Sequence, residues 1–210
     1  MLASAMALSG VAQAKPISDK ADSQCAKLAI KTFGPSFNPS TYTFHGGTVG
    51  EDNFTFVEGS ADGSDVYCGF GSNDQIDTLN VGDIFLGGEG IDEVSFNDGT
   101  FNGEAGNDHV FSNDGTFNGG ADSDSVDTNE VHGTFNGGDG NDSVSFNTAI
   151  FNGEGGNDSV TTTNTDIFNG GDGDDSVGTN DANGTFNGGD GTDTVTDNQG
   201  TIINVELGDV

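Results

Sequence analysis

The chain has very few basic residues, no arginine and no tryptophan. Its only basic side chains, apart from three histidines, are Lys15, Lys20, Lys27 and Lys31, and the formal net charge is -31 over 210 residues. An acidic stretch without basic residues repels nucleic-acid phosphates and anionic membrane surfaces. Nucleic-acid binding and membrane insertion are therefore excluded. Such a stretch either stays expanded or recruits cations.

Large aliphatic residues are also scarce, whereas glycine contributes 36 residues and phenylalanine 16. This composition argues against a layered globular core. The simplest alternative is an acidic disordered chain, because dense like charge opposes compaction. A fixed internal period would decide against disorder, since it overrides residue-by-residue expectations.

The first 14 residues indicate a cleaved secretory signal. They are small and apolar, and they end in Ala12-Gln13-Ala14, an A-x-A pattern that precedes a polar run. The stretch is too short to span a bilayer. We expect a signal peptide over residues 1–14, a mature start near Lys15, and a secreted protein that is extracellular or at the cell surface.

Only two cysteines are present, Cys25 and Cys68. They are compatible with one disulfide in an oxidising compartment, which would join the N-terminal segment to the start of the acidic region. Two free buried thiols are the alternative.

A repeat of 16 to 18 residues runs through most of the chain, as in FNGGDGNDSVSFNTAI. Each unit has one phenylalanine and one valine flanked by polar residues, the pattern of two short strands with a single buried side chain each. These columns are Phe85, Phe101, Phe117, Phe135, Phe151, Phe168 and Phe186, and Val94, Val110, Val126, Val144, Val160, Val177 and Val195.

A single unit cannot bury its phenylalanine and valine, but units stacked at the inter-strand spacing of about 4.8 Å place like residues over like residues. The predicted fold is therefore all-β, a parallel β-solenoid with a narrow continuous core. We expect a small N-terminal cap over residues 15–59, the solenoid over residues 60–201, and a C-terminal tail over residues 202–210.

One asparagine recurs at the opposite end of each unit. Asparagine suits turns, and stacked asparagine amides can hydrogen-bond from coil to coil, so we predict a structural asparagine ladder. Its members are Asn97, Asn113, Asn129, Asn147, Asn164, Asn180 and Asn198.

Nine-residue glycine-aspartate blocks recur within the repeat. Four of them, GGEGIDEVS, GGDGNDSVS, GGDGDDSVG and GGDGTDTVT, resemble the hemolysin-type calcium-binding repeats of the RTX family, whose consensus is G-G-x-G-x-D-x-U-x. Three further blocks are near matches, with Glu104 or Glu154 in place of the second glycine or Asp122 in place of the third. The resemblance covers roughly residues 60–201. It implies a parallel β-roll in which the sixth-position aspartate and backbone carbonyls bind Ca²⁺.

The residue types have a physical reason to bind calcium. Glycines let the backbone turn tightly with its carbonyls inward, aspartate adds an anionic oxygen, and Ca²⁺ takes six to eight oxygens. One turn supplies about half of these, so an ion has to sit between successive turns, and folding should be coupled to metal binding. Eight turns enclose seven gaps, which predicts about seven ions.

The candidate ligands are the eight aspartates and the glycines of the four full matches. They are Asp74, Asp92, Asp108, Asp124, Asp142, Asp158, Asp175 and Asp193, with Gly88, Gly90, Gly138, Gly140, Gly171, Gly173, Gly189 and Gly191. Asp65 and Asp83 are candidates for weaker sites on the opposite edge. An EF-hand needs glycine at the sixth loop position, whereas the sixth residue from Asp139 is Val144.

We expect no catalytic activity, because no nucleophile-base motif occurs and His45, His109 and His132 have no recurring partner. A structural, cell-surface or adhesive role is predicted, with the partner, whether self, cell surface or matrix, left open. An accessory domain of an enzyme is one alternative, which a fused catalytic domain would reveal.

Ice binding is the other alternative, and a thermal-hysteresis measurement distinguishes it. Strand alternation points Thr100 and Asn102 and their equivalents away from the core as a flat Thr/Asn array, although Ile150 and Ile167 break the threonine row.

Overall fold

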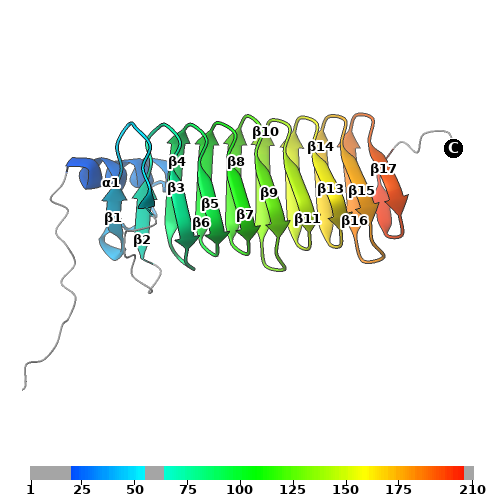
Figure 1. The fold of residues 1–210 in the computed structure, drawn as a ribbon, viewed down its shortest axis with the longest axis horizontal. Helices are drawn as coiled ribbons and strands as arrows, with labels where there is room; N and C mark the ends of the chain where they lie inside the picture. The colour runs from blue at the N-terminus through cyan, green and yellow to red at the C-terminus, as the bar shows by residue number, and fades with distance from the viewer. Residues whose placement is uncertain (1–19, 55–63, 206–210) are drawn as a thin grey trace, which may run out of the picture.

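Two parallel sheets wind into a β-solenoid rod in the computed structural model (Figure 1). The structure describes residues 20–54 and 64–205, so the expected signal peptide lies outside the described residues. The ten-stranded sheet, here sheet A, has the order β1-β2-β4-β6-β8-β10-β12-β14-β16-β18, and the eight-stranded sheet B has the order β17-β15-β13-β11-β9-β7-β5-β3. The predicted all-β solenoid is confirmed.

Each coil runs from a strand of sheet A through a glycine-aspartate turn to a strand of sheet B, and then through an asparagine turn to the next coil. We call these two edges of the rod the aspartate edge and the asparagine edge. Sheet A consists of β1 (Thr43–Gly46), β2 (Asp65–Cys68), β4 (Ile84–Glu89), β6 (Thr100–Ala105), β8 (Thr116–Ala121), β10 (Thr134–Asp139), β12 (Ile150–Gly155), β14 (Ile167–Asp172), β16 (Thr185–Asp190) and β18 (Thr201–Ile203). Sheet B consists of β3 (Gln75–Leu79), β5 (Glu93–Asn97), β7 (His109–Asn113), β9 (Ser125–Asn129), β11 (Ser143–Asn147), β13 (Ser159–Asn164), β15 (Ser176–Asn180) and β17 (Thr194–Asn198).

The core lies between the sheets and is as narrow as the repeat predicts. All seven phenylalanines of the repeat are fully buried from sheet A, and the valines from Val94 to Val177 face them from sheet B. Consecutive phenylalanine rings stack with centroids 4.7 to 5.0 Å apart, which matches the strand spacing. Each coil therefore rests mainly on its two neighbours.

The predicted asparagine ladder is confirmed. From Asn97 to Asn180, each Nδ2 donates to the Oδ1 of the equivalent asparagine in the next coil at 2.6 to 2.9 Å. Most of these Nδ2 groups also donate to a threonine or isoleucine carbonyl across the turn, as Asn129 does to Ile150 at 2.9 Å. A neutral amide is both donor and acceptor, so each buried amide from Asn113 onward is satisfied by its neighbours, and Asn97 Oδ1 at the start of the column accepts no hydrogen bond from the described residues.

A second asparagine column follows the outer face of sheet A. Its hydrogen bonds run in the opposite direction, from Asn118 Nδ2 to Asn102 Oδ1 at 2.6 Å and then coil by coil to Asn169. The expected threonine row lies beside it, because Thr100, Thr116 and Thr134 are in register and only partly buried, and Ile150 and Ile167 interrupt it as expected.

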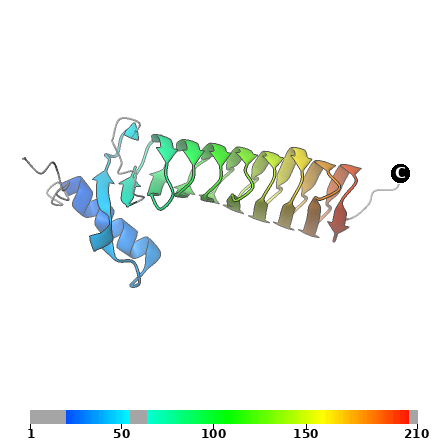
Figure 2. The same cartoon turned by 90° about the horizontal axis from the view of Figure 1, so that it is seen from below.

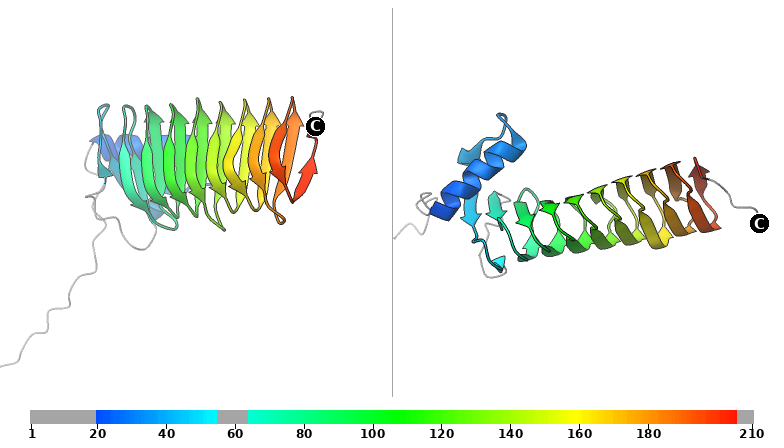
Figure 3. Two further views of the ribbon diagram at one scale, coloured as in Figure 1. Left: turned by 45° about the vertical axis from the view of Figure 1, so that its right-hand side comes forward. Right: turned by 90° about the horizontal axis from the view of Figure 1, so that it is seen from above.

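The N-terminal segment adds a helix and one more strand. Helix α1 (Lys20–Phe33) carries Asp22 in its first turn and Lys31 in its last, charges that complement the helix dipole. It lies at the N-terminal end of the rod, against the first strands of sheet A (Figures 2 and 3). No helix among the described residues is long and apolar enough to cross a membrane. A 3₁₀ helix, η1 (Pro39–Thr41), leads into β1.

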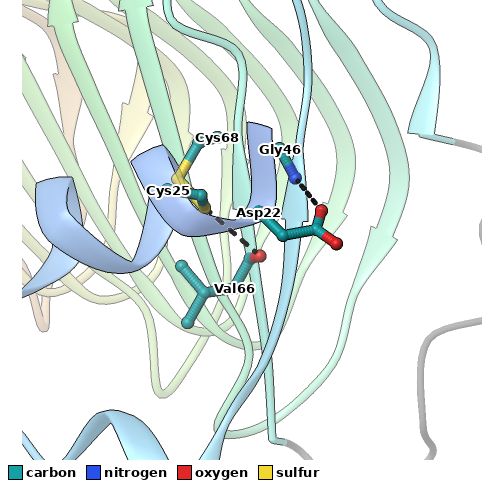
Figure 4. Close-up of a disulfide and its surroundings, with 5 residues drawn as sticks. All are labelled: Asp22, Cys25, Gly46, Val66 and Cys68. Carbon is teal, nitrogen blue, oxygen red and sulfur yellow. Dashed lines mark hydrogen bonds between the residues drawn. A yellow bond between two sulfur atoms is a disulfide. The ribbon is translucent and has the colours of Figure 1, made fainter. Parts of the chain in front are cut away.

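Strand β1 belongs to the range expected for the cap, yet it pairs in register with β2 and so continues the ladder of sheet A. The predicted Cys25–Cys68 disulfide is confirmed and ties α1 to β2 (Figure 4). The N-terminal segment is therefore joined to the solenoid by a sheet, an apolar contact and a covalent bond.

The buried ladder should contribute more to stability than the outer one. Asn129→Ala leaves Asn147 Oδ1 and the Ile150 carbonyl without their buried donor, and we expect the free energy of unfolding to fall by about 2–4 kcal/mol. Asn136→Ala is the matched control, since this half-buried outer asparagine also makes two ladder bonds, and it should cost about 1 kcal/mol. Urea unfolding measures both, and equal losses would contradict this account.

Candidate metal centre

The eight sixth-position aspartates form one continuous column on the aspartate edge. Each is at most 2% exposed. From Asp74 to Asp193, the backbone N–H of one aspartate donates to Oδ1 of the aspartate in the next coil at 2.7 to 2.9 Å. The structure therefore brings together all eight aspartates that the sequence singled out, and it employs one oxygen of each in the stacking.

The second carboxylate oxygen, Oδ2, differs from Oδ1 in its hydrogen bonding. Oδ2 is buried and accepts no hydrogen bond from the described residues in seven of these aspartates, namely Asp74, Asp92, Asp108, Asp124, Asp142, Asp158 and Asp175. Buried polar atoms normally have a partner, because an unsatisfied acceptor costs about 1–3 kcal/mol and a charged one costs more. Seven such atoms in one column need a common explanation.

The first glycine of each turn shows where Oδ2 points. A Cβ added to Gly137 would overlap Oδ2 of Asp142 and would lie 2.8 Å from the carbonyl oxygen of Gly153 in the next coil. The same pair of oxygens surrounds the first glycine of the other turns of the column. Each gap between coils therefore brings a buried carboxylate oxygen close to a backbone carbonyl oxygen.

The eight glycines predicted as ligands give the turn its backbone conformation. Gly138 and Gly140 have φ values of +109° and +155°, in the region that favours glycine, and the equivalent glycines of the other full matches do likewise. Glu104, Glu154 and Asp122 adopt φ of +77° at these positions, so the substituted turns keep the backbone form at a cost of about 1 kcal/mol each.

The first glycine of the turn is not among the residues that the sequence predicts for the site. Its φ is not positive, and its role comes from space alone. The available signal was its presence in all eight turns, whereas the second and third glycines are sometimes replaced.

Burial raises the pKa of the column carboxyls, and neighbouring carboxylates add to this effect while the backbone hydrogen bonds oppose it. The pKa rises to about 6 for Asp74 and Asp142. It rises to about 7 for Asp92, Asp158 and Asp175, and to about 8 for Asp108 and Asp124 in the middle of the column. A proton or a cation at Oδ2 would relieve the same unfavourable charge.

Carboxylates elsewhere in the first coils have protein partners instead. Asp83 Oδ2 accepts bonds from the backbone N–H and the Nδ2 of Asn80, at 3.2 and 3.1 Å, and His45 Nε2 lies 2.8 Å from Asp65 Oδ1. Asp65 and Asp83 thus lie on the opposite edge as predicted, but Asp83 differs from the column in its satisfied Oδ2. His109 and His132 each pair with an aspartate of a neighbouring coil.

The structure also contains a turn that the sequence analysis assigned to the cap. This turn comprises residues 47–52. The backbone N–H of Asp52 donates to Asp74 Oδ1 at 2.7 Å, as the backbone N–H groups of the column aspartates do to one another. Its own Oδ2 accepts the Thr48 N–H at 2.6 Å. The sequence signal is weak, because only Gly47, Gly50 and Asp52 match the consensus.

Among residues 20–54 and 64–205, no three His, Cys, Asp or Glu side chains converge on one point. An ion on the aspartate edge would therefore take most of its ligands from the backbone. No family model, curated protein or solved structure matches the chain. The fold and this column are therefore the features from which a function can be inferred.

Alanine substitutions test whether the turn has room for a side chain at the first glycine. Gly137→Ala should destabilise the protein strongly, by about 2 kcal/mol or more, because the new Cβ overlaps Asp142 Oδ2. Gly155→Ala, two positions further along the equivalent turn of the next coil, is the control. Its Cβ would meet nothing closer than 3.7 Å, and Ala105 and Ala121 already occupy that position. Thermal unfolding compares the two variants, which should not behave alike.

The raised pKa values predict how pH acts on metal-free protein. A carboxyl whose pKa is higher in the folded state than its unfolded value of about 3.9 stabilises the fold fully below that value. This contribution is lost as pH rises through the folded values of about 6 to 8. After divalent cations are removed on a chelating resin, the melting temperature should therefore fall between pH 5.5 and pH 8. A melting temperature that rises over this interval would contradict the assignment.

Proposed function

We propose that the chain is a secreted calcium-binding β-solenoid, in which Ca²⁺ ions along the aspartate edge hold successive coils together. The observation that carries the proposal is the column of seven buried Oδ2 atoms without a hydrogen-bond donor among the described residues. Each lies close to a carbonyl oxygen of the next coil. Calcium is the biological cation that favours carboxylate and carbonyl oxygens in flexible arrangements of six to eight.

The residues present fit such an ion. Oδ2 of the sixth-position aspartate and the carbonyl of the first glycine in the following coil would be ligands, and further carbonyls of the two turns would complete the set. A bound cation supplies positive charge that neutralises the carboxylates on either side of a gap. The remaining work belongs to the chain itself, because Oδ1 and the backbone N–H groups position each carboxylate before an ion arrives.

The charge of the chain favours a bound cation, rather than basic side chains, as the group that neutralises the aspartate column. No lysine or arginine follows Lys31. The only side chains after Lys31 that could carry a positive charge are therefore His45, His109 and His132. At neutral pH the carboxyls of Asp74 and Asp142, with pKa values of about 6, are mostly ionised, so protonation alone leaves part of the column charged.

The biological role that fits is structural, at a cell surface or in a matrix, and we expect no catalytic activity. A rod whose stability depends on dissolved calcium is suited to a location outside the cell, where weak calcium sites of extracellular modules can fill. Ice binding by the Thr/Asn array stays an alternative prediction. We rank it lower because Ile150 and Ile167 interrupt the row and the outer asparagines already bond to one another.

Calcium titration of the metal-free protein tests the proposal. We expect about seven ions to bind and β circular dichroism to rise with occupancy, because eight turns enclose seven gaps. Asp142→Asn should bind at least one ion fewer and melt at a lower temperature in calcium. Asp139→Asn is the matched control, since it removes the same charge from an exposed position of the same turn. Equal stoichiometry for the two variants, or a β signal indifferent to calcium, would refute the proposal.

A further inference from the structure

The first coils differ from the later coils in how they are stabilised. We define the N-terminal module as residues 20–54 together with β2 and β4. In this module the strands bury side chains on both faces: all four residues of β2 and the first five of β4 are buried. From β6 to β16, the first four residues of each sheet A strand alternate between buried and more exposed positions. Among the described residues, an apolar core on each side of sheet A occurs only in the module.

The second core lies under α1. Cys25, Ala26 and Ala29 of the helix pack against the outward side chains of β1, β2 and β4, which are Phe44, Val66, Cys68, Ile84 and Leu86. In the next coil these outward positions are taken by Thr100 and Asn102. The apolar strip thus ends at β4, and the polar Thr/Asn array begins at β6.

Contact between α1 and β1 is close. Gly46 N–H donates to Asp22 Oδ1 at 3.1 Å (Figure 4), and a Cβ at Gly46 would overlap the backbone of Ala21. The module is therefore closed by a packed helix, a hydrogen bond and the disulfide, none of which involves the aspartate column.

Three acidic groups in the module or directly next to it, Asp52, Asp65 and Asp83, also have protein partners. Asp52 Oδ2 accepts a hydrogen bond from the Thr48 N–H, and Asp83 Oδ2 accepts one from the Asn80 N–H. His45 Nε2 lies 2.8 Å from Asp65 Oδ1. The first buried carboxylate oxygen of the column without a donor among the described residues is Asp74 Oδ2. The need for an external positive charge starts at that residue.

Three connections from the module converge on the turn that contains Asp74. Cys68, in the disulfide, immediately precedes Gly69, the first residue of the turn. Phe70, its second residue, adopts φ of +75° and packs into the same apolar cluster as Leu28 of α1. Asp52 N–H donates to Asp74 Oδ1. The first turn of the column thus has two metal-independent contacts that the following turns do not have, the adjacent disulfide and the packing of Phe70.

We propose that the N-terminal module folds without metal and serves as the template on which the calcium-binding coils stack, one after another, toward the C-terminus. This inference rests on the proposed function, and it adds a direction to it. Each ion needs two stacked turns, and only the turn at Asp74 has a neighbour already in place when no ion is bound. Filling therefore proceeds from the Asp74–Asp92 gap outward.

Hydrogen exchange followed by mass spectrometry tests the direction. In metal-free protein, α1, β1, β2 and β4 should exchange slowly, whereas β7 through β18 should exchange close to the rate of an unfolded chain. With increasing calcium, protection should reach β5 and β6 before β15 and β16. Simultaneous protection of all coils, or protection that starts near β17, would overturn the inference.

Two variants with the same chemistry at opposite ends of the column sharpen the test. Asp92→Asn blocks an early gap and should abolish calcium-dependent protection in the coils that follow it, through to β18. Asp175→Asn blocks a late gap and should leave protection from β5 to β13 at the wild-type level. Equal, local losses in the two variants would overturn templating while the calcium proposal survives. If calcium changes no protection in the unsubstituted protein, the calcium proposal itself fails, and templating fails with it.

Discussion

Carboxylates stacked one strand apart must be neutralised, and the rest of the structure depends on this constraint. Each added coil buries a phenylalanine and a valine, which stabilises it by about 1.5–3 kcal/mol per side chain. Each coil also adds a buried aspartate about 4.8 Å from the last, and at an effective dielectric constant near 20 one such pair repels by about 3 kcal/mol. The two effects are comparable, so the charge state of the aspartate edge decides whether another coil adds stability.

The two edges of the rod solve the same geometric problem with different chemistry. On the asparagine edge, each amide from Asn113 to Asn180 donates to one neighbour and accepts from the other, whereas Asn97 Oδ1, at the start of the column, accepts no hydrogen bond from the described residues. On the aspartate edge, a carboxylate can only accept. Oδ1 takes the backbone N–H of the preceding coil, and Oδ2 faces another acceptor, the carbonyl of the following coil. Two facing acceptors need a proton or a cation between them.

Features that recur in every coil could be predicted from the sequence, because repetition converts weak local preferences into columns. The phenylalanine, valine and inner asparagine columns and the eight stacked aspartates all belong to this class. Among features that occur once, the Cys25–Cys68 disulfide could be predicted because the chain has a single pair of cysteines, but others could not. Strand β1 and the Gly47–Asp52 turn have no repeated template, and the satisfaction of Asp52 by Thr48 depends on side-chain direction. The role of the first glycine also escaped, because it comes from overlap with an atom five residues away.

The choice of aspartate has a consequence that asparagine would not have. Asparagine at the sixth position could form a third self-satisfied ladder, and the chain already uses that arrangement twice, inside the asparagine edge and outside sheet A. Aspartate in the same place leaves a buried acceptor in each of seven coils. In the function proposed above, the stability of those coils depends on the pH and the cation content of the solution. Asp52 and Asp83, in contrast, have protein donors at Oδ2. Under the proposed templating, the first coils form without metal and the later coils form only with it, so the surrounding solution would control the length of ordered solenoid rather than its shape.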